Sequence, residues 1–255
     1  FAHRILYYGP RSLEQVAATL QKLHNVPATL KPVPVVADYP IRSVSADTVF
    51  FINYDMVQAE ILWIAKGDAT YNAASVPAID MYNEYYGGGM SSLVFQTIRE
   101  SKALAYSTYS YYSQPERREE PHFTVAYIGT QADKLNDAVL SMDSLLHDMP
   151  RAELAFANSK EALRIKLETE RILRDDILFN YEQARKLWLD HDVRADVYSR
   201  LPSLTYDDIA AFHATHVKNG QYTMLILGSK DRIDLKSLSR YGVVKELTLK
   251  EVFGY

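Results

Sequence analysis

Three consecutive glycines, Gly87, Gly88 and Gly89, could do chemistry, because backbone N–H groups freed of side chains can cradle an anion at the start of a helix. A phosphate-binding loop would continue with Gly-Lys-Ser or Gly-Lys-Thr, or show the spacing Gly-x-Gly-x-x-Gly, and the sequence contains neither pattern. The glycines also follow a predicted helix instead of a strand. We therefore interpret them as a sharp corner between two helices, where backbones approach closely.

A second candidate is the pair His213 and His216, because two imidazoles three residues apart on a helix can share a zinc ion. The sequence has neither His-x-x-Glu-His nor His-Glu-x-x-His, the patterns that complete such a site. The neighbours Thr215, Lys218 and Asn219 are typical of a solvated helix end, so we predict an ordinary surface pair. A Gly-x-Ser-x-Gly motif is absent as well, which removes the support for a serine hydrolase.

The composition limits the classes of protein that these residues could serve. The chain has 255 residues, of which 47% are hydrophobic and 24% charged, with a net charge of −4. These values exclude a disordered chain, a collagen and a coiled coil, and they supply no general attraction for nucleic acid or anionic lipid. No apolar run is long enough to cross a bilayer. Cysteine is absent, which excludes disulfides and thiolate ligands but leaves the periplasm and the cytoplasm both open.

Tyrosine is unusually frequent, with 19 copies against 9 phenylalanines. The ring is apolar and the hydroxyl polar, so tyrosine suits wet grooves and peptide contacts. Aromatic residues also favour strands, and we assign most of the 19 to that role.

The first 45 residues differ from the rest of the chain in proline content and in predicted secondary structure. Residues 4–9 predict a short strand, and Ser12 can cap a following helix; because one strand and one helix cannot fold alone, we assign 1–24 to the tail of a preceding domain or to an arm. Four prolines fall within fourteen residues between Pro27 and Pro40, which predicts a linker over 25–45.

The remaining chain mixes strands and helices. We predict a main domain over 46–230 and a short tail over 231–255 packed on it. Short connections separate the early strands, which predicts hairpins between them. This indicates an α+β fold with a mostly antiparallel sheet and helices on one face. The predicted strands cover 48–54, 59–65, 103–113, 122–129 and 222–228, and the predicted helices cover 73–86, 132–147, 152–172, 175–190 and 207–217.

One segment carries a more specific signal: Asn83-Glu-Tyr-Tyr-Gly-Gly-Gly-Met-Ser-Ser-Leu-Val-Phe-Gln-Thr-Ile-Arg-Glu-Ser-Lys-Ala-Leu-Ala-Tyr106. It resembles the C-terminal half of the pitrilysin and insulin-degrading-enzyme family of zinc peptidases, which includes the mitochondrial processing peptidases. The resemblance extends over roughly 45–230 through weaker matches. These lie at Val57–Glu60, Ile128–Thr130, Leu204–Ile209 and Leu225–Gly228.

The resemblance implies roles for particular residues. In this family the N-terminal half binds zinc, and the C-terminal half contributes an Arg and a Tyr, seven residues apart, that reach the bound peptide; Arg99 and Tyr106 hold the matching positions. A guanidinium can donate to peptide carbonyls, and a phenol can donate to a developing oxyanion. We expect Gly87–Gly89 to set the corner that aims this pair and, with Ser91, to contact the substrate. The alternative reading is a helix-end ion pair and a strand aromatic.

The inverted zinc motif is absent from the sequence. The resemblance then implies either a C-terminal piece of a longer peptidase or a subunit whose partner carries the zinc. In both cases we expect this chain alone to bind no catalytic zinc and to cleave no peptide. A silent relative that serves as a structural or peptide-binding subunit is the alternative function. A homodimer, with strand 4–9 docked on a neighbouring sheet edge, is also predicted.

Overall fold

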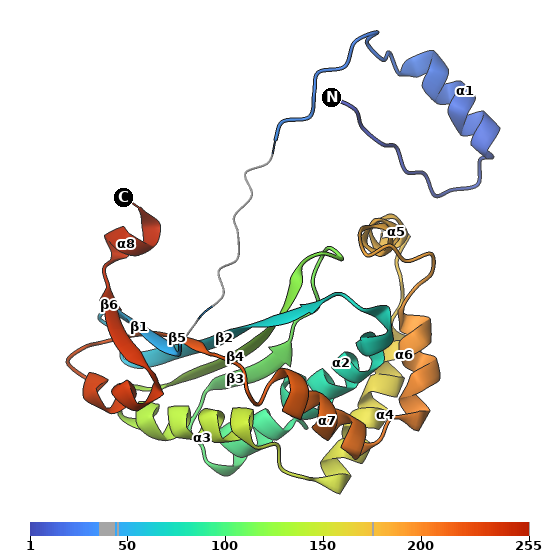
Figure 1. The fold of residues 1–255 in the computed structure, drawn as a ribbon. Helices are drawn as coiled ribbons and strands as arrows, with labels where there is room; N and C mark the ends of the chain where they lie inside the picture. Colours follow the sequence, from blue (N-terminus) through green and yellow to red (C-terminus); the bar gives the residue numbers. More distant parts are fainter. Residues whose placement is uncertain (36–43, 45, 175, 255) are drawn as a thin grey trace.

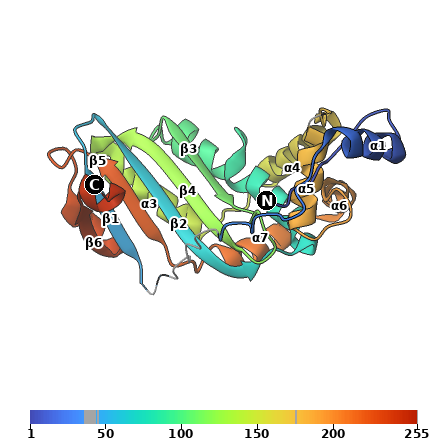
Figure 2. The same cartoon turned by 90° about the horizontal axis from the view of Figure 1, so that it is seen from above.

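The structure is a computed structural model that describes residues 1–35, 44, 46–174 and 176–254. Its centre is a six-stranded sheet in the order β3-β4-β2-β5-β1-β6 (Figures 1 and 2). The predicted linker 25–45 falls partly outside the described residues, and its described part, 25–35 and residue 44, forms neither helix nor strand. The strands are β1 Thr48–Asn53, β2 Gln58–Thr70, β3 Ser107–Tyr112, β4 Pro121–Gln131, β5 Thr223–Gly228 and β6 Val243–Leu247.

The sheet is mixed. The pairs β3–β4, β4–β2 and β2–β5 are antiparallel, whereas β1 runs parallel to both β5 and β6. The α+β class and the mostly antiparallel sheet are therefore confirmed. The expected hairpin between the first two strands is wrong, because β5 lies between β1 and β2 and the four-residue connection Tyr54–Val57 joins strands that are not paired.

Helices cover one face of the sheet (Figure 1). Alternation along the strands explains why: in β4, His122, Thr124, Ala126 and Ile128 are buried beneath the helices, while the intervening side chains on the opposite face are partly exposed. We call this second face the open face. The helices that build the covered layer are α2 Val76–Asn83, α3 Leu135–His147, α4 Glu153–Thr169, α6 Arg194–Arg200 and α7 Tyr206–His216.

Two further helices stand away from this layer. Helix α5, Asp176–Lys186, has no buried residue, and the short α8, Leu249–Phe253, follows β6. The predictions missed α6, β6 and α8. Strand β6 pairs with β1 along its whole length and so forms one edge of the sheet.

The N-terminal segment contains α1, Leu13–Leu23, which begins with a capping box between Ser12 and Gln15 and has no buried residue. It lies apart from the sheet in Figure 1. The strand predicted at 4–9 is not formed, because a strand requires a hydrogen-bonded neighbour and this segment has none among the described strands. A salt bridge of 2.5 Å joins Arg4 to Glu182 on α5. None of the described helices is long and apolar enough to cross a membrane.

Candidate functional site

The glycine corner begins where α2 widens into a π-helix, Glu84–Gly88. Gly87 is buried, and a Cβ atom added to it would lie 2.2 Å from the carbonyl oxygen and 2.6 Å from the nitrogen of Ser110 in β3. No side chain fits between these two backbones, so the position requires glycine. Single π-turns occur frequently at functional sites.

Asn83, one residue before the π-helix, binds the outer edge of the same strand. Its side-chain amide donates to the carbonyl of Tyr112 at 3.0 Å, and its side-chain oxygen accepts from the Tyr112 N–H at 2.7 Å. Because β3 is an edge strand, its outer backbone groups would otherwise lack a strand partner. The corner is thus fixed to β3 by Asn83 at one point and by Gly87 at another.

A second helical turn starts at Ser92, whose hydroxyl accepts from the Phe95 N–H at 3.4 Å. Ser92 therefore caps this turn, whereas Ser91, predicted to contact the substrate, is exposed. The turn continues as a second π-helix, Phe95–Ser101, in which Ile98 is buried. Arg99 lies on this π-helix with 46% of its side chain exposed. Its guanidinium is 4.8 Å from the Phe95 ring centroid, and its contact with Glu100 is a loose 4.0 Å.

The segment from Arg99 to Tyr106 is held by backbone contacts. The Leu104 N–H donates to the Ile98 carbonyl at 2.9 Å, and Thr130 donates its hydroxyl to the Leu104 carbonyl at 2.5 Å. Ala103 has a positive φ of 48°, a conformation that costs a side-chain-bearing residue free energy. Lys134 donates to the Ala103 carbonyl at 3.0 Å.

Tyr106 is 55% exposed just before β3. Its N–H donates to the Gly129 carbonyl at 2.9 Å, and its hydroxyl oxygen accepts a hydrogen bond of 2.7 Å from the Gln131 amide. Sequence reasoning missed Gln131, and only its position at the end of β4 could have indicated it. Arg99 and Tyr106 are thus both exposed and both carried by a constrained backbone, although their contacts are with different neighbours. Of the other predicted site residues, Gly88 is exposed and Gly89 partly exposed.

Tyrosines continue from this point across the open face. The rings of Tyr109 and Tyr127 stack with centroids 4.9 Å apart, and Tyr111 follows at 5.9 Å from Tyr109. The Tyr127 hydroxyl donates to the Glu60 carboxylate; burial, and then this acidic neighbour, raise the pKa of Tyr127. Both Tyr109 and Tyr111 are more than one-third exposed. The alternating tyrosines of the run 103–113 were the signal for this surface, which the sequence analysis assigned to strand filling.

The histidine pair is not a surface pair, and that prediction is wrong for His213. This residue is 3% exposed, and its ring lies 6.0 Å from that of Tyr82 and 5.4 Å from that of Tyr86. Burial lowers the pKa of His213 to about 4. His216 packs instead on Phe212, with ring centroids 4.7 Å apart.

No group of three or more His, Cys, Asp or Glu residues in the described part of the chain is placed to hold a metal ion. The residues present here therefore do not fit a catalytic zinc.

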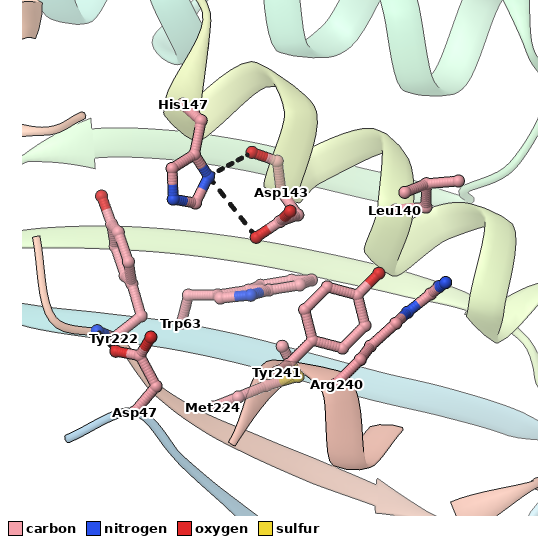
Figure 3. Close-up of a pocket in the computed structure, with 9 residues that line it drawn as sticks. All are labelled: Asp47, Trp63, Leu140, Asp143, His147, Tyr222, Met224, Arg240 and Tyr241. Atoms are coloured by element: carbon pink, nitrogen blue, oxygen red, sulfur yellow. Dashed lines mark hydrogen bonds and ion pairs between the residues drawn. The ribbon is translucent and has the colours of Figure 1, made fainter. Parts of the chain in front are cut away.

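A separate cavity of about 370 Å³ opens on the helix-covered side, between α3 and strands β2 and β5 (Figure 3). The His147 ring lies 3.5 Å from the Asp143 carboxylate, and burial raises the pKa of Asp143. Trp63 and Met224, which line it, are almost fully buried. None of the predicted site residues lines it. The lining residues are Asp47, Trp63, Leu140, Asp143, His147, Tyr222, Met224, Arg240 and Tyr241.

With the fold and the site in place, comparison with known proteins defines the class. A family of sequences described as the peptidase M16 inactive domain matches residues 7–159, and the chain belongs to this family. The resemblance to zinc peptidases inferred from the segment 83–106 is thereby confirmed. The match begins inside the N-terminal segment 1–24.

Individual relatives carry the same class of name. The chain is 36% identical over 85 residues to the uncharacterized zinc protease YmxG of Bacillus subtilis, covering 32% of this chain and 20% of the relative. It is 30% identical over 133 residues to an uncharacterized zinc protease of Rickettsia felis, covering 52% of this chain and 30% of that protein. The chain therefore spans less than one-third of the length of these relatives.

Solved structures share the fold. A peptidase M16 inactive domain from Pseudomonas fluorescens aligns with a TM-score of 0.63 at 15% identity, over 79% of this chain and 48% of that one. A protease from Helicobacter pylori aligns with a TM-score of 0.66 at 14% identity, over 86% of this chain and 53% of that one. This chain thus corresponds to about half of each of these structures.

Proposed function

We propose that this chain is the non-catalytic, substrate-clamping part of a zinc metalloendopeptidase, and that it acts on peptides held by a zinc-bearing N-terminal half or partner subunit. The inactive-domain family and the zinc-protease names of the relatives support the class. The observation that carries the proposal is the exposure of Arg99 and Tyr106 on a backbone that is fixed between the second π-helix and β3.

The hydrogen bond that Tyr106 receives from Gln131 suits a role of the Tyr106 hydroxyl as a hydrogen-bond donor. Because the Gln131 amide donates to the hydroxyl oxygen, the hydroxyl proton of Tyr106 remains for another acceptor, such as the oxyanion that forms on a peptide carbonyl. Gln131 is a positioning residue in this scheme.

Arg99 supplies a permanent charge. Its guanidinium has only a loose contact with Glu100, so its N–H groups can donate to the carbonyls of a bound peptide. Gly88, Gly89 and Ser91, on the corner beside it, are proposed to contact the same peptide.

The open face extends this surface. The stacked Tyr109, Tyr111 and Tyr127 offer apolar rings with polar tips beside Tyr106, an arrangement suited to an extended peptide of varied sequence. No helix of the covered layer lies on this face.

The test combines this chain with the zinc-bearing half and follows cleavage of a quenched fluorescent peptide. We expect Tyr106→Phe to lower kcat about 10²-fold, the effect of losing one oxyanion donor. We expect Arg99→Ala to lower kcat/KM by a similar factor. Tyr54→Phe is the matched control, because Tyr54 is also 55% exposed but lies between β1 and β2.

Unchanged rates in both Tyr106→Phe and Arg99→Ala would refute the assigned roles. If the same variants also kept peptide affinity, a structural subunit would be the correct description. In the same assay without the zinc-bearing half, we expect no cleavage of the peptide by the parent chain or by any variant.

A further inference from the structure

Helix α5 ends in an unusual way. The Leu189 N–H donates to the Ala184 carbonyl at 2.8 Å and the Trp188 N–H to the Arg185 carbonyl at 3.1 Å, which is the Schellman pattern of helix termination. The residue after the helix cap in this pattern adopts a left-handed conformation and is usually glycine. Here it is Trp188, with φ of 62°.

Burial does not explain this choice. A bulky side chain in the left-handed region costs conformational free energy, and such residues persist where the surroundings or a function require them. The Trp188 side chain is 73% exposed, so it gains little from packing. A glycine would satisfy the helix end at lower cost, and the indole therefore needs a role on the surface.

The exposed indole forms one wall of a cavity of about 580 Å³ between the end of α5 and the loop that joins β3 to β4. Arg118 of that loop places its guanidinium 4.9 Å from the centroid of the Trp188 ring. The loop is held against α5 by a hydrogen bond of 3.0 Å from the Gln183 amide to the Glu116 carbonyl. The Tyr71 N–H also donates to the Arg118 carbonyl, at 3.2 Å, which fixes the backbone of this arginine.

The cavity is predominantly basic. Arg117, Arg118 and Lys186 line it, against one carboxylate, Glu119. Arg117 is 3.9 Å from Glu120, whereas Arg118 and Lys186 form no ion pair with the residues that the structure describes. A guanidinium stacked on an indole keeps its N–H edge free to bind a carboxylate in bidentate fashion.

We propose that this cavity, the Trp188–Arg118 site, binds acidic residues of peptides. The inference rests on the proposed function and specifies the substrate class. Helix α5 and the β3–β4 loop both stand on the open-face side of the sheet, opposite α2, α3 and α4 (Figure 1). A peptide extended along the tyrosines of the open face can reach the site with a Glu or Asp side chain, while its apolar parts pack on the indole.

Binding can be measured without the zinc-bearing half. Three fluorescein-labelled peptides are compared by fluorescence anisotropy against the 255-residue chain; they are identical except that four positions hold Glu, Gln or Lys. We expect the Glu peptide to bind about tenfold more tightly than the Gln peptide at low salt, and the Lys peptide to bind more weakly than either. Equal affinities for the Glu and Gln peptides would overturn the proposal.

Two variants locate the preference. Trp188→Gly should reduce affinity for the Glu peptide about fivefold while raising the thermal midpoint, because glycine suits the left-handed position. Arg118→Gln should abolish the preference for Glu over Gln. Phe179→Ala is the control, since Phe179 is 72% exposed on the same helix and does not line the cavity. A Trp188→Gly chain that is more stable and retains full affinity would show that the indole has no binding role.

The two proposals can fail separately. Tyr106→Phe is expected to leave the Glu-to-Gln preference intact. If the cleavage assay shows no role for Tyr106 but the preference is present, the Trp188–Arg118 site stands and the clamping function falls. If the preference is absent while Tyr106→Phe slows cleavage, the reverse holds.

Discussion

The backbone of Gly87 lies against the backbone of Ser110, so close that an added Cβ would come within 2.2 Å of the Ser110 carbonyl oxygen. This contact joins the first π-helix to the edge strand β3, which Tyr106 immediately precedes. The position of Tyr106 therefore depends on a backbone contact that leaves no room for a side chain at residue 87.

Replacing Gly87 with alanine should destabilise the chain by about 3 kcal/mol, because two backbones must move apart to admit a methyl group. Urea denaturation followed by circular dichroism measures the change. Gly89→Ala is the control: its φ of −112° is ordinary, and the atom that its Cβ would approach, at 2.8 Å, is the flexible Glu84 carboxylate. That control should stay within about 0.5 kcal/mol of the parent. Equal losses in the two variants would contradict the account.

Asn83→Ala should cost about 2 kcal/mol of unfolding free energy, since it removes both hydrogen bonds to Tyr112 and leaves the partly buried strand edge without them. Asn219→Ala, at an exposed turn position, serves as the comparison and should be near neutral. Hydrogen exchange of the Tyr112 amide gives a local readout, and protection retained in Asn83→Ala would argue against the pairing.

Acid should destabilise the fold through His213. Burial, followed by the charge of Lys218, lowers its pKa to about 4, with Asp148 acting in the opposite direction. The unfolded chain, whose histidine has a pKa of about 6.5, binds the proton more tightly, so stability falls as the pH drops from about 6.5 to about 4. Relative to His213→Leu, the parent should lose about 3 kcal/mol between pH 7 and pH 4. A pH-independent difference between the two proteins would exclude this effect.

Asp80 should act with the opposite sign in the same pH range. Burial raises its pKa to about 6, and the charge of Lys166 and the Gln114 hydrogen bond only partly offset this. The folded state then binds the proton more tightly than the unfolded chain, whose Asp has a pKa of about 4, so ionisation of Asp80 lowers the stability of the fold as the pH rises from about 4 to about 6, and the full loss is present above that. Asp80→Asn keeps an acceptor for Gln114 and should be about 2 kcal/mol more stable at pH 8. The gain should vanish near pH 4, and a gain that persists there would indicate another cause.

Local patterns predicted most elements of the main domain. The strands near 48–54, 122–129 and 222–228 and the helices near 132–147 and 207–217 form close to where periodicity placed them. The pairing of β1 was not predictable in this way, because its partners β5 and β6 follow more than half the chain later. Strand β6 was missed since its alternation is carried by only five residues with two charges, Lys245 and Glu246.

The candidate site, like the fold, could be predicted only in part from local sequence patterns. Arg99 and Tyr106 were found through a resemblance, and no spacing rule would have selected them. The sequence predicted an exposed His213 because residues near it on the helix are polar. The side chain is buried because it packs against Tyr82 and Tyr86, and this tertiary contact leaves no local signal in the sequence. Trp188 gave no signal either, since a left-handed residue is normally recognised by a glycine.

The position of β1 between β5 and β6 has a consequence for how the domain assembles. The first strand of the sheet in the chain finds both neighbours only in the last ones, Thr48 opposite Thr223 on one side and Val243 on the other. On a ribosome, β1 emerges early and its apolar residues must wait for nearly the whole domain to be synthesised. Such distant partners slow folding, and we therefore expect the apolar residues of β1 to stay exposed until the end of the domain has been synthesised.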